Sequence, residues 1–466
     1  MRSRIFANLG FLLQITGLLT LFPIAIGLVF NETEHLVALF LACVGFLASG
    51  FLMNALCERK DLDFKSSSLL FLMAFIVLPL IGAVPYVYSN PFNSQNIIDR
   101  FTNSYFESLS GFTTTGFTFI SNADMLPKSL LFYRSLTELM GGVGIVFLLL
   151  AFFQSRKSLD SLGNALGIDK VSSSLKKMFF SVFAIYGAYI MLFTAIFYFL
   201  GFQDLLKTGS FVIDTITGGF QPPAQQFQQY LYIVPKICMI VLMFAGSVNF
   251  AVNYHLFALK PRKAMSMELA LYLLIIAVGT SLVMLFTKIE PLDSLFHVVS
   301  MSSSTGYDYI NIPMVSNTVL SIFIVLMIIG GCAFSMAGGI RISRLISFGK
   351  AVKQSIKGVL AKEKVILDYD RSLQTNSIEN LSAVVSILLL IFTLVIFAIA
   401  FSTLGISFTD ALFEVGSALT TNGISMGATT VSMPVAYKWL MIVAMTIGRV
   451  EIMSILVALS PYRTKE

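Results

Sequence analysis

Four short stretches rich in glycine and hydroxyl side chains recur along this chain, each just before a long apolar segment. They read TTTGF, TGGF, SSSTGY and TTNGI, and they contain Gly116, Gly219, Gly306 and Gly423. A second glycine follows each one after 24 to 27 residues, at Gly141, Gly246, Gly330 and Gly448. A pattern that returns at a nearly fixed spacing is typical of an internal repeat. Four copies of one unit can surround a single axis.

The composition indicates that these repeats lie in a membrane. Of the 466 residues, 56% are hydrophobic and only 12% are charged, and the mean hydropathy is +0.83. Segments of about 20 apolar residues can cross a bilayer as helices, which satisfy their own backbone hydrogen bonds. We therefore predict an all-α polytopic membrane protein. Its ten apolar segments lie near 5–30, 36–56, 68–88, 129–153, 178–201, 229–257, 267–287, 316–340, 380–402 and 436–459.

A shorter apolar segment precedes each glycine motif and is too short to span, as a re-entrant half-helix would be. Phe106, Phe296 and Phe413 each lie ten residues before their glycine, whereas the poorer second copy has Gly209 there. The predicted unit is helix, pore helix, filter loop, helix, and four such units would surround a pseudo-fourfold pore. The predicted divisions are two N-terminal helices at 1–57, repeats at 66–155, 177–258, 266–345 and 378–460, and a cytoplasmic connector at 346–377.

The basic residues predict the orientation. Of the 31 Lys and Arg residues, Arg449 lies inside an apolar segment, and most of the others are on the side opposite the glycine loops. The loop side has Arg100, Lys128, Arg134, Lys207, Lys236, Lys288 and Lys438. Because cytoplasmic loops carry an excess of Lys and Arg, both termini are expected in the cytoplasm and the glycine loops outside.

The same pattern argues against other classes of protein. The net charge of +6 has no clustered basic face, so we expect no nucleic-acid partner. The sequence shows no catalytic triad, zinc-ligand spacing or phosphate-binding loop, so we do not expect an enzyme. Cys43, Cys57, Cys238 and Cys332 lie in or beside apolar segments and are expected to be ordinary thiols. The N-terminal apolar segment is longer than a signal peptide requires and is interpreted as a retained helix.

The glycine loops have the composition that passage of a dehydrated cation needs. Rings of backbone carbonyls can replace the water shell of an ion, and glycine accepts the backbone angles that aim successive carbonyls at one axis. The pore helices would direct their partly negative C-terminal ends towards the ion. A single glycine of this kind is more often a tight turn or a close helix contact, but four in register favour a pore.

Two features lie where a gate would be. Arg449 follows Gly448 inside an apolar helix, and a membrane-embedded arginine is a functional candidate by default. It could face the pore, or it could pair with a buried acid, for which Glu138 is the candidate. The run 330–339 contains Gly330, Gly331, Gly338 and Gly339, and we predict that it breaks into an intramembrane loop. A kinked, tightly packed helix is the alternative.

Further polar residues allow two interpretations each. Glu107 and Glu414 lie nine residues before their glycines, His297 is the third-copy equivalent, and Asp214 lies elsewhere in the second half-helix. These side chains could attract cations at the mouth, or they could bond the loop backbone, which we favour. The basic stretch 349–357 is interpreted as a helix near anionic lipid, with a docking surface for a cytoplasmic partner as the alternative.

At these residues the chain resembles the Trk, Ktr and HKT superfamily of potassium transporters, and most closely the TrkH type. The resemblance covers essentially the whole chain and implies potassium uptake through a homodimer in the cytoplasmic membrane, with one pore per protomer. It also implies a nucleotide-binding RCK-type regulatory partner. By position in the family, the ion would contact Thr114, Thr115, Thr217, Gly218, Ser304, Thr305, Thr421 and Asn422, mainly through carbonyls. Glycine at position 116 favours potassium, since serine there accompanies sodium permeation.

Two other functions remain open. An alternating-access symporter coupled to protons or sodium would also move cations, but such carriers often have inverted repeats, whereas these four share one orientation. A membrane receptor that transports nothing would have no need for four glycines.

Overall fold

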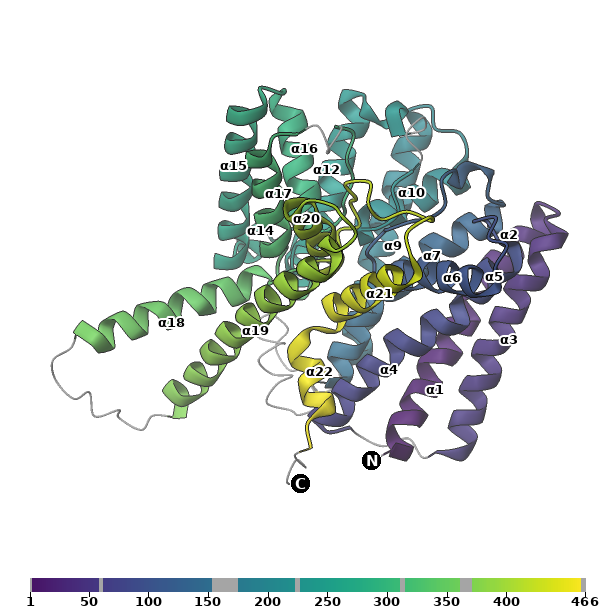
Figure 1. Cartoon of the computed structure of the whole chain (residues 1–466), viewed down its shortest axis with the longest axis horizontal. Coiled ribbons are helices and arrows are strands. Elements are labelled where there is room, and N and C mark those ends of the chain that lie inside the picture. The colour runs from purple at the N-terminus through teal and green to yellow at the C-terminus, as the bar shows by residue number, and fades with distance from the viewer. Residues whose placement is uncertain are drawn as a thin grey trace.

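The computed structural model describes residues 2–57, 62–152, 175–222, 227–310, 315–360 and 371–461, and within them it contains helices and no strand (Figure 1). The α-helices are α1 (Arg2–Leu19), α2 (Leu21–Val29), α3 (Thr33–Leu56), α4 (Phe64–Gly82), α5 (Val84–Ser89), α6 (Ile97–Phe112), α7 (Lys128–Phe152), α9 (Leu175–Phe199), α10 (Leu205–Thr217), α12 (Ile233–Ser247), α13 (Phe250–Phe257), α14 (Pro261–Ala264), α15 (Met267–Thr287), α16 (Pro291–Ser303), α17 (Asn317–Ile329), α18 (Ile342–Leu360), α19 (Arg371–Ser402), α20 (Phe408–Leu419), α21 (Val435–Val450) and α22 (Ile452–Leu459). The all-α prediction is confirmed.

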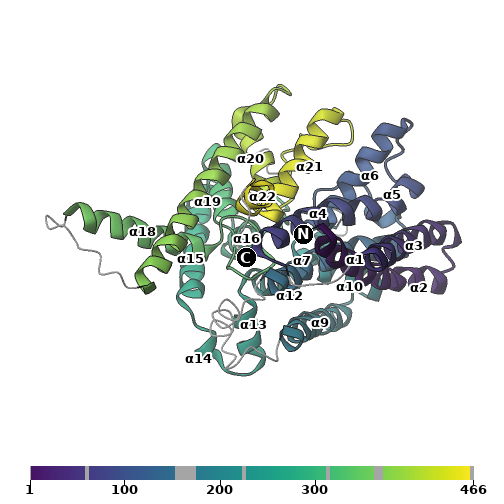
Figure 2. The ribbon, with the colours of Figure 1, turned by 90° about the horizontal axis from the view of Figure 1, so that it is seen from below.

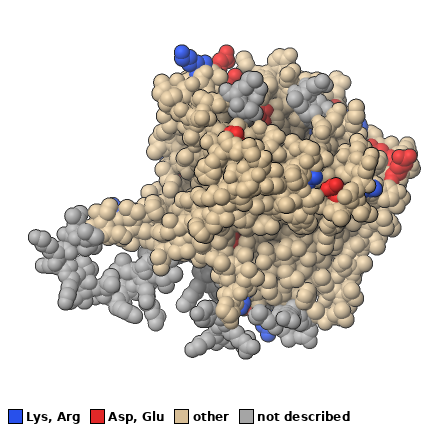
Figure 3. Space-filling view, viewed as in Figure 1, with Lys and Arg blue, Asp and Glu red and all other residues tan. Residues whose placement is uncertain are grey.

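The helices make a multi-pass membrane protein. Among the described residues, six helical runs are long and apolar enough to cross a bilayer: Arg4–Val29, Thr33–Leu56, Lys65–Ser89, Ser181–Phe199, Met267–Thr287 and Asn380–Ser402. Two bent helix pairs raise the possible number to eight. Figure 3 shows the corresponding surface, on which charged side chains lie mainly near the edges and the broad middle is uncharged.

Each of the ten predicted apolar segments contains helix, but two of them are sharply bent where the sequence predicted no break. The segment predicted at 229–257 is α12 and α13, which are bent by 120° at Val248 and Asn249. The segment predicted at 436–459 is α21 and α22, bent by 92° at Glu451, where φ is +66°. The third break, between α17 and α18, was predicted from its glycines and is confirmed.

The N-terminal helices lie against the side of the molecule. Helices α1 and α3 approach closely at Gly10 and Gly50, where a Cβ on Gly50 would be only 2.6 Å from the Gly10 carbonyl oxygen. At the opposite side, α18 and α19 project beyond the body in both views (Figures 1 and 2). The predicted basic helix at 349–357 lies within α18. Residues 361–370 of the predicted connector are outside the described residues.

Four short helices, α6, α10, α16 and α20, are the predicted half-helices. They contain 16, 13, 13 and 12 residues, so each is too short to cross a bilayer. Side-chain caps at Asn96, Asp204 and Ser407 start three of them, and Pro291 starts α16. Their C-terminal halves are buried in the body. Helices α6 and α20 end directly before their glycine motifs, and α10 and α16 end within theirs.

Candidate cation pathway

Three of the glycine loops have the same backbone shape. Each has two residues with left-handed φ separated by one residue, and the second of the two is the predicted glycine. These pairs are Thr114 (+52°) with Gly116 (+85°), Ser304 (+60°) with Gly306 (+74°), and Thr421 (+54°) with Gly423 (+77°). Non-glycine residues seldom adopt such angles, and where they do the surrounding structure must hold them. The three loops are therefore built alike and under constraint.

The second loop differs from the prediction. Its positive φ of +73° occurs at Gly218, one residue before Gly219, which the spacing had aligned with Gly116. Helix α10 continues to Thr217, whose hydroxyl donates to the Ile213 carbonyl at 2.7 Å. The Thr113 hydroxyl likewise donates to the Leu109 carbonyl at 2.8 Å. Thr217 therefore ends its helix with the same hydroxyl bond that Thr113 makes at the end of α6. The sequence could not show that the positive φ lies at Gly218, because the two residues after Thr217 are both glycines.

The four loops meet one another in a closed ring of close backbone approaches. A Cβ on Gly423 would lie 1.9 Å from the Thr115 oxygen, and one on Gly306 would lie 1.7 Å from the Asn422 oxygen. A Cβ on Gly116 would lie 2.4 Å from the Gly219 oxygen, and one on Gly218 would lie 2.5 Å from the Ser304 oxygen. The loops therefore follow the order first, second, third, fourth and back to the first. At these points only glycine fits.

Side-chain hydroxyls beside the ring are mostly engaged in local bonds. Thr113 and Thr115 are 2.7 Å apart at their hydroxyls, and Ser303 and Thr305 are 2.9 Å apart. Among the described residues, the buried Oγ1 atoms of Thr114 and Thr421 and Oδ1 of Asn422 have no hydrogen-bond partner. Buried polar atoms usually have partners. These unpartnered oxygen atoms at the ring are suited to contact a cation.

The two homologous glutamates bond the loop backbone, as we favoured. Glu107 accepts from the Phe119 amide at 3.0 Å and from the Thr118 hydroxyl at 2.8 Å. Glu414 accepts from the Met426 amide at 2.7 Å and from the Thr429 hydroxyl at 2.6 Å. Each carboxylate holds the segment that follows the glycine loop of its own repeat.

The other two predicted residues behave differently. His297 places Nδ1 2.7 Å from the Asp293 carbonyl oxygen and lies against the Tyr309 ring, with centroids 4.4 Å apart. Asp214 is buried in α10, and its Oδ1 atom has no partner among the described residues. Neither side chain repeats the contacts of the two glutamates.

The glycine-rich run 330–339 forms a non-helical loop between α17 and α18, so the alternative of a kinked helix is wrong. We call it the intramembrane loop after its predicted position. The loop is tied to its surroundings by the Cys332 amide, which donates to the Ser247 oxygen at 2.9 Å, and by the Met336 amide, which donates to the Gly246 oxygen at 3.0 Å. A Cβ on Gly338 would lie 2.4 Å from the Thr420 oxygen. The loop therefore lies directly against the fourth glycine loop at Gly338. The other predicted glycines of this run pack within the loop and against its neighbours: Gly330 lies near Gly338, Gly331 near Ser247, and Gly339 near Met327.

Arg449 is 2% exposed and bonds the intramembrane loop. It donates to the Met336 carbonyl in the intramembrane loop at 3.0 Å and to the Gly141 carbonyl in α7 at 2.9 Å. No acidic side chain among the described residues pairs with it. The suggested partner, Glu138, accepts from the Phe220 amide at 2.7 Å, so the alternative of an Arg449–Glu138 pair is wrong.

Comparison with known proteins agrees with this geometry. The family described as TrkH, cation transport protein, matches residues 42–289 and 161–463 of this chain. The chain belongs to the TrkH family. An uncharacterized cation transporter of Methanocaldococcus jannaschii is 30% identical over 455 residues, which cover 96% of this chain and 93% of that protein.

More distant members of the family match over most of their length. The Trk system potassium uptake protein TrkH of Salmonella typhimurium is 24% identical over 427 residues, covering 87% of each chain. The crystal structure of the potassium transporter TrkH from Vibrio parahaemolyticus has a TM-score of 0.83 at 21% identity and covers 99% of each chain. This last similarity shows that the two chains share a fold.

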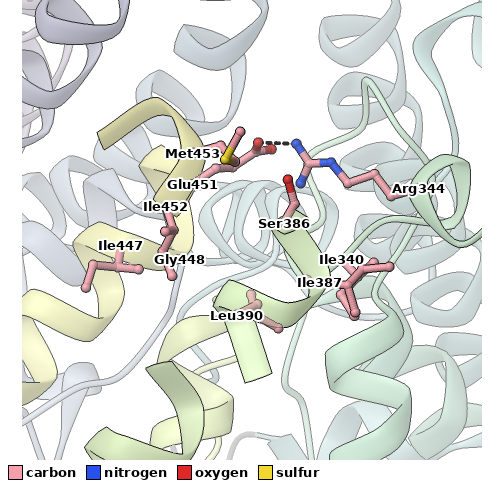
Figure 4. Close-up of a pocket in the computed structure, with 11 residues that line it drawn as sticks. Ile340, Arg344, Ser386, Ile387, Leu390, Ile447, Gly448, Glu451, Ile452 and Met453 are labelled. Atoms are coloured by element: carbon pink, nitrogen blue, oxygen red, sulfur yellow. Dashed lines mark hydrogen bonds and ion pairs between the residues drawn. The ribbon is translucent and has the colours of Figure 1, made fainter. Parts of the chain in front are cut away.

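Sequence reasoning missed the role of Glu451 in this TrkH-family chain. Its carboxylate pairs with Arg341 at 3.2 Å and with Arg344, and Figure 4 shows the Arg344 side chain reaching it from α18. Arg344 and Glu451 border a cavity of about 30 Å³ between the end of the intramembrane loop, α19 and the α21–α22 bend. The charge of Glu451 was visible in the sequence, but its partners are more than 100 positions away.

Basic residues that join neighbouring repeats were also missed. Lys236 on α12 pairs with Asp293 on α16, and Lys438 on α21 donates to the Asn103 side chain on α6 at 2.8 Å. Arg134 on α7 pairs with Glu107 at 2.8 Å and lies 3.9 Å from the centre of the Phe220 ring. In the sequence these three residues were counted among the basic residues on the side of the glycine loops. The structure shows that their side chains are buried beside the half-helices.

Proposed function

We propose that this protein takes up potassium ions through a gated pore whose filter is the ring formed by Thr114–Gly116, Thr217–Gly219, Ser304–Gly306 and Thr421–Gly423. The closed ring of backbone approaches is the observation that carries the proposal. Four half-helices end at this ring, and their partly negative C-termini would favour a cation at its centre. Relatives named as Trk system potassium uptake proteins support potassium as the transported ion.

The filter would coordinate the dehydrated ion mainly with carbonyl oxygens, because most of the hydroxyls at the ring are held by neighbouring atoms. Glycine at position 116 supports a preference for potassium. The second loop contributes a different arrangement, since its positive φ is at Gly218. Selectivity then depends on what holds that loop in place.

The gate in this proposal is the intramembrane loop together with Arg449. The guanidinium group is bonded to the loop at Met336 and to α7 at Gly141, so it closes the space between two repeats. Its charge would oppose a cation that leaves the filter towards the cytoplasm. Movement of the loop would break the Met336 contact and open the route.

Assembly and orientation extend the proposal. The family resemblance supports a homodimer with one pore in each protomer and a cytoplasmic RCK-type partner. The excess of Lys and Arg supports an inner-membrane protein with both termini in the cytoplasm and the filter facing outside. Helix α1 begins and α22 ends at the same edge of the molecule, which agrees with an even number of crossings (Figure 1). The divisions predicted from the sequence remain our assignment of the repeats.

Ion flux into proteoliposomes tests the proposal. Purified full-length protein should take up rubidium, as a potassium substitute, down its gradient and should take up sodium more slowly. A pore needs no proton gradient, whereas an alternating-access symporter would move rubidium uphill when a proton or sodium gradient is imposed. Uphill uptake would replace the pore with the symporter, and absence of rubidium-selective flux would refute potassium transport.

A further inference from the structure

Glu138 on α7 contacts the backbone of the second filter loop directly, a contact that the sequence did not predict. Its Oε1 accepts from the Phe220 amide at 2.7 Å, and its Oε2 accepts from the Thr217 hydroxyl at 3.3 Å. A Cβ on Gly219 would lie 1.9 Å from Oε1 and 2.1 Å from Oε2. Both carboxylate oxygens therefore face the backbone of this loop. They fit there because Gly219 has no Cβ.

This contact replaces one that the second repeat lacks. The first and fourth loops are held by carboxylates of their own half-helices, Glu107 and Glu414, nine residues before the filter glycine. Counted back from Gly219, this position in the second repeat is Ser210, whose buried hydroxyl has no partner among the described residues, and its neighbours Gly209 and Phe211 have no carboxylate either. A serine is too short to reach the loop. The carboxylate comes instead from the neighbouring repeat.

Other contacts around Phe220 show that this loop is held from several sides. The Tyr307 hydroxyl donates to the Phe220 carbonyl at 3.1 Å, and the Arg134 guanidinium lies 3.9 Å from the Phe220 ring centre. Gln221 exchanges two hydrogen bonds with the Asp308 backbone, at 2.6 and 3.1 Å. Among these groups, only Glu138 bonds the amide that follows the two glycines. Its removal would free that amide, whereas the Thr217 hydroxyl would keep its bond to the Ile213 carbonyl at 2.7 Å.

We propose that Glu138 is a positioning residue which holds the second filter loop across the repeat boundary and thereby sets the cation preference of that quarter of the ring. The inference rests on the proposed function, because it assigns a selectivity role within the same filter. Glu138 does not contact the ion. It acts through the Thr217–Phe220 backbone, whose carbonyls point where Glu138 holds them.

The test compares Glu138→Ala with Glu138→Gln in proteoliposomes, with the ratio of rubidium to sodium uptake as the readout. Alanine removes both acceptors, and we expect the ratio to fall about tenfold, which corresponds to about 1.4 kcal/mol. Glutamine keeps a carbonyl that can accept from the Phe220 amide, so its ratio should stay within about threefold of wild type. The matched control is Asp204→Asn, which retains a capping side chain at the start of α10 and lies away from the filter.

A double variant separates positioning from general damage. Gly219→Ala alone should lower the ratio, because its methyl group would overlap the Glu138 carboxylate. Combined with Glu138→Ala, it should cause a much smaller further loss, since residues in contact are coupled. The melting temperatures of the purified variants measure the same coupling in terms of stability and need no transport assay. A variant too damaged to transport ions therefore still tests the contact.

The outcomes are distinct. A wild-type protein without rubidium-selective flux refutes the proposed function itself. A selective wild-type protein whose Glu138→Ala variant keeps the same ratio overturns the positioning role alone. Equal losses from Gly219→Ala in the two backgrounds, in melting temperature as well as in ratio, would also overturn it.

Discussion

At the scale of single residues, the site is defined by positions where a side chain cannot be placed. Gly116, Gly306 and Gly423 combine a left-handed φ with a neighbouring backbone less than 2.5 Å from any Cβ. Alanine at such a position would be strained twice, first by its φ and then by the contact. The sequence identified these glycines through their spacing. It named both Gly218 and Gly219 but could not tell which of them has the left-handed φ, since TGGF offers two glycines and only the fold decides between them.

The first prediction concerns Gly423→Ser. The added Cβ would lie 1.9 Å from the Thr115 oxygen, so the carbonyls of two neighbouring loops must move. We expect the rubidium-to-sodium uptake ratio to fall roughly tenfold, which corresponds to about 1.4 kcal/mol. Gly427→Ser is the control, because Gly427 also has a positive φ of +97° but no atom within 4 Å of its Cβ position. Equal ratios in the two variants would contradict a role for crowding at the ring.

The second prediction concerns Arg449→Ala. Its guanidinium bonds the intramembrane loop and α7 and has no described acidic partner, so its charge opposes cations beneath the filter. Removing the charge and both hydrogen bonds should raise basal rubidium flux several-fold. Arg449→Lys keeps the charge and should raise flux less. A fall in flux, or no change, in well-folded Arg449→Ala protein would reject the gate.

At the scale of elements, the helices were predictable and two of their breaks were not. The four glycines of the run 330–339 predicted the break between α17 and α18. The α12–α13 break depends instead on distant partners, because the amides of Cys332 and Met336 bond the Ser247 and Gly246 carbonyls that end α12. The Asn249 side chain then caps α13 by accepting from the Ala251 amide at 2.9 Å. Hydropathy reports length and apolarity, and it carries no information about such contacts.

The third prediction concerns the bend at Glu451, which joins α21 to α22. Its carboxylate pairs with Arg341 and Arg344 at the end of the intramembrane loop, so it links the bend to the loop (Figure 4). Glu451→Gln leaves two arginines without their acid and should lower stability by about 1–3 kcal/mol. The melting temperature of the purified protein measures this loss.

The exposed Glu34 supplies the control for this prediction. Glu34→Gln should change stability by no more than about 0.5 kcal/mol. The variant with both Arg344→Gln and Glu451→Gln should lose less than the sum of the two single changes, because the partners are removed together. An unchanged melting temperature in Glu451→Gln protein would mean that the arginines do not depend on this acid.

At the scale of the whole molecule, four half-helices meet at one ring, and the buried basic residues Arg134, Lys236 and Lys438 join neighbouring repeats at its rim. Arg134 lies at the first–second boundary through its contact with the Phe220 ring, Lys236 lies at the second–third boundary, and Lys438 lies at the fourth–first boundary. The boundary between the third and fourth repeats instead has the contact of Gly338 with the Thr420 oxygen. Arg449 also crosses this boundary through Met336, and Arg341 and Arg344 cross it through Glu451. It is the boundary beside the intramembrane loop, where the proposed gate must move.

The fourth prediction concerns the orientation of the chain. In a background with the native cysteines replaced by alanine, Lys288→Cys at the end of α15 should react with a membrane-impermeant maleimide applied to intact cells. Lys353→Cys on α18 should react only after permeabilisation, because the excess of Lys and Arg places that helix in the cytoplasm. Both lysines are exposed in the structure, so accessibility to the reagent depends on the side of the membrane. Labelling of Lys353→Cys in sealed cells would reverse the topology. The filter would then face the cytoplasm, and the same ring of carbonyls would meet potassium from inside the cell, which is incompatible with an uptake pore that is gated beneath its filter.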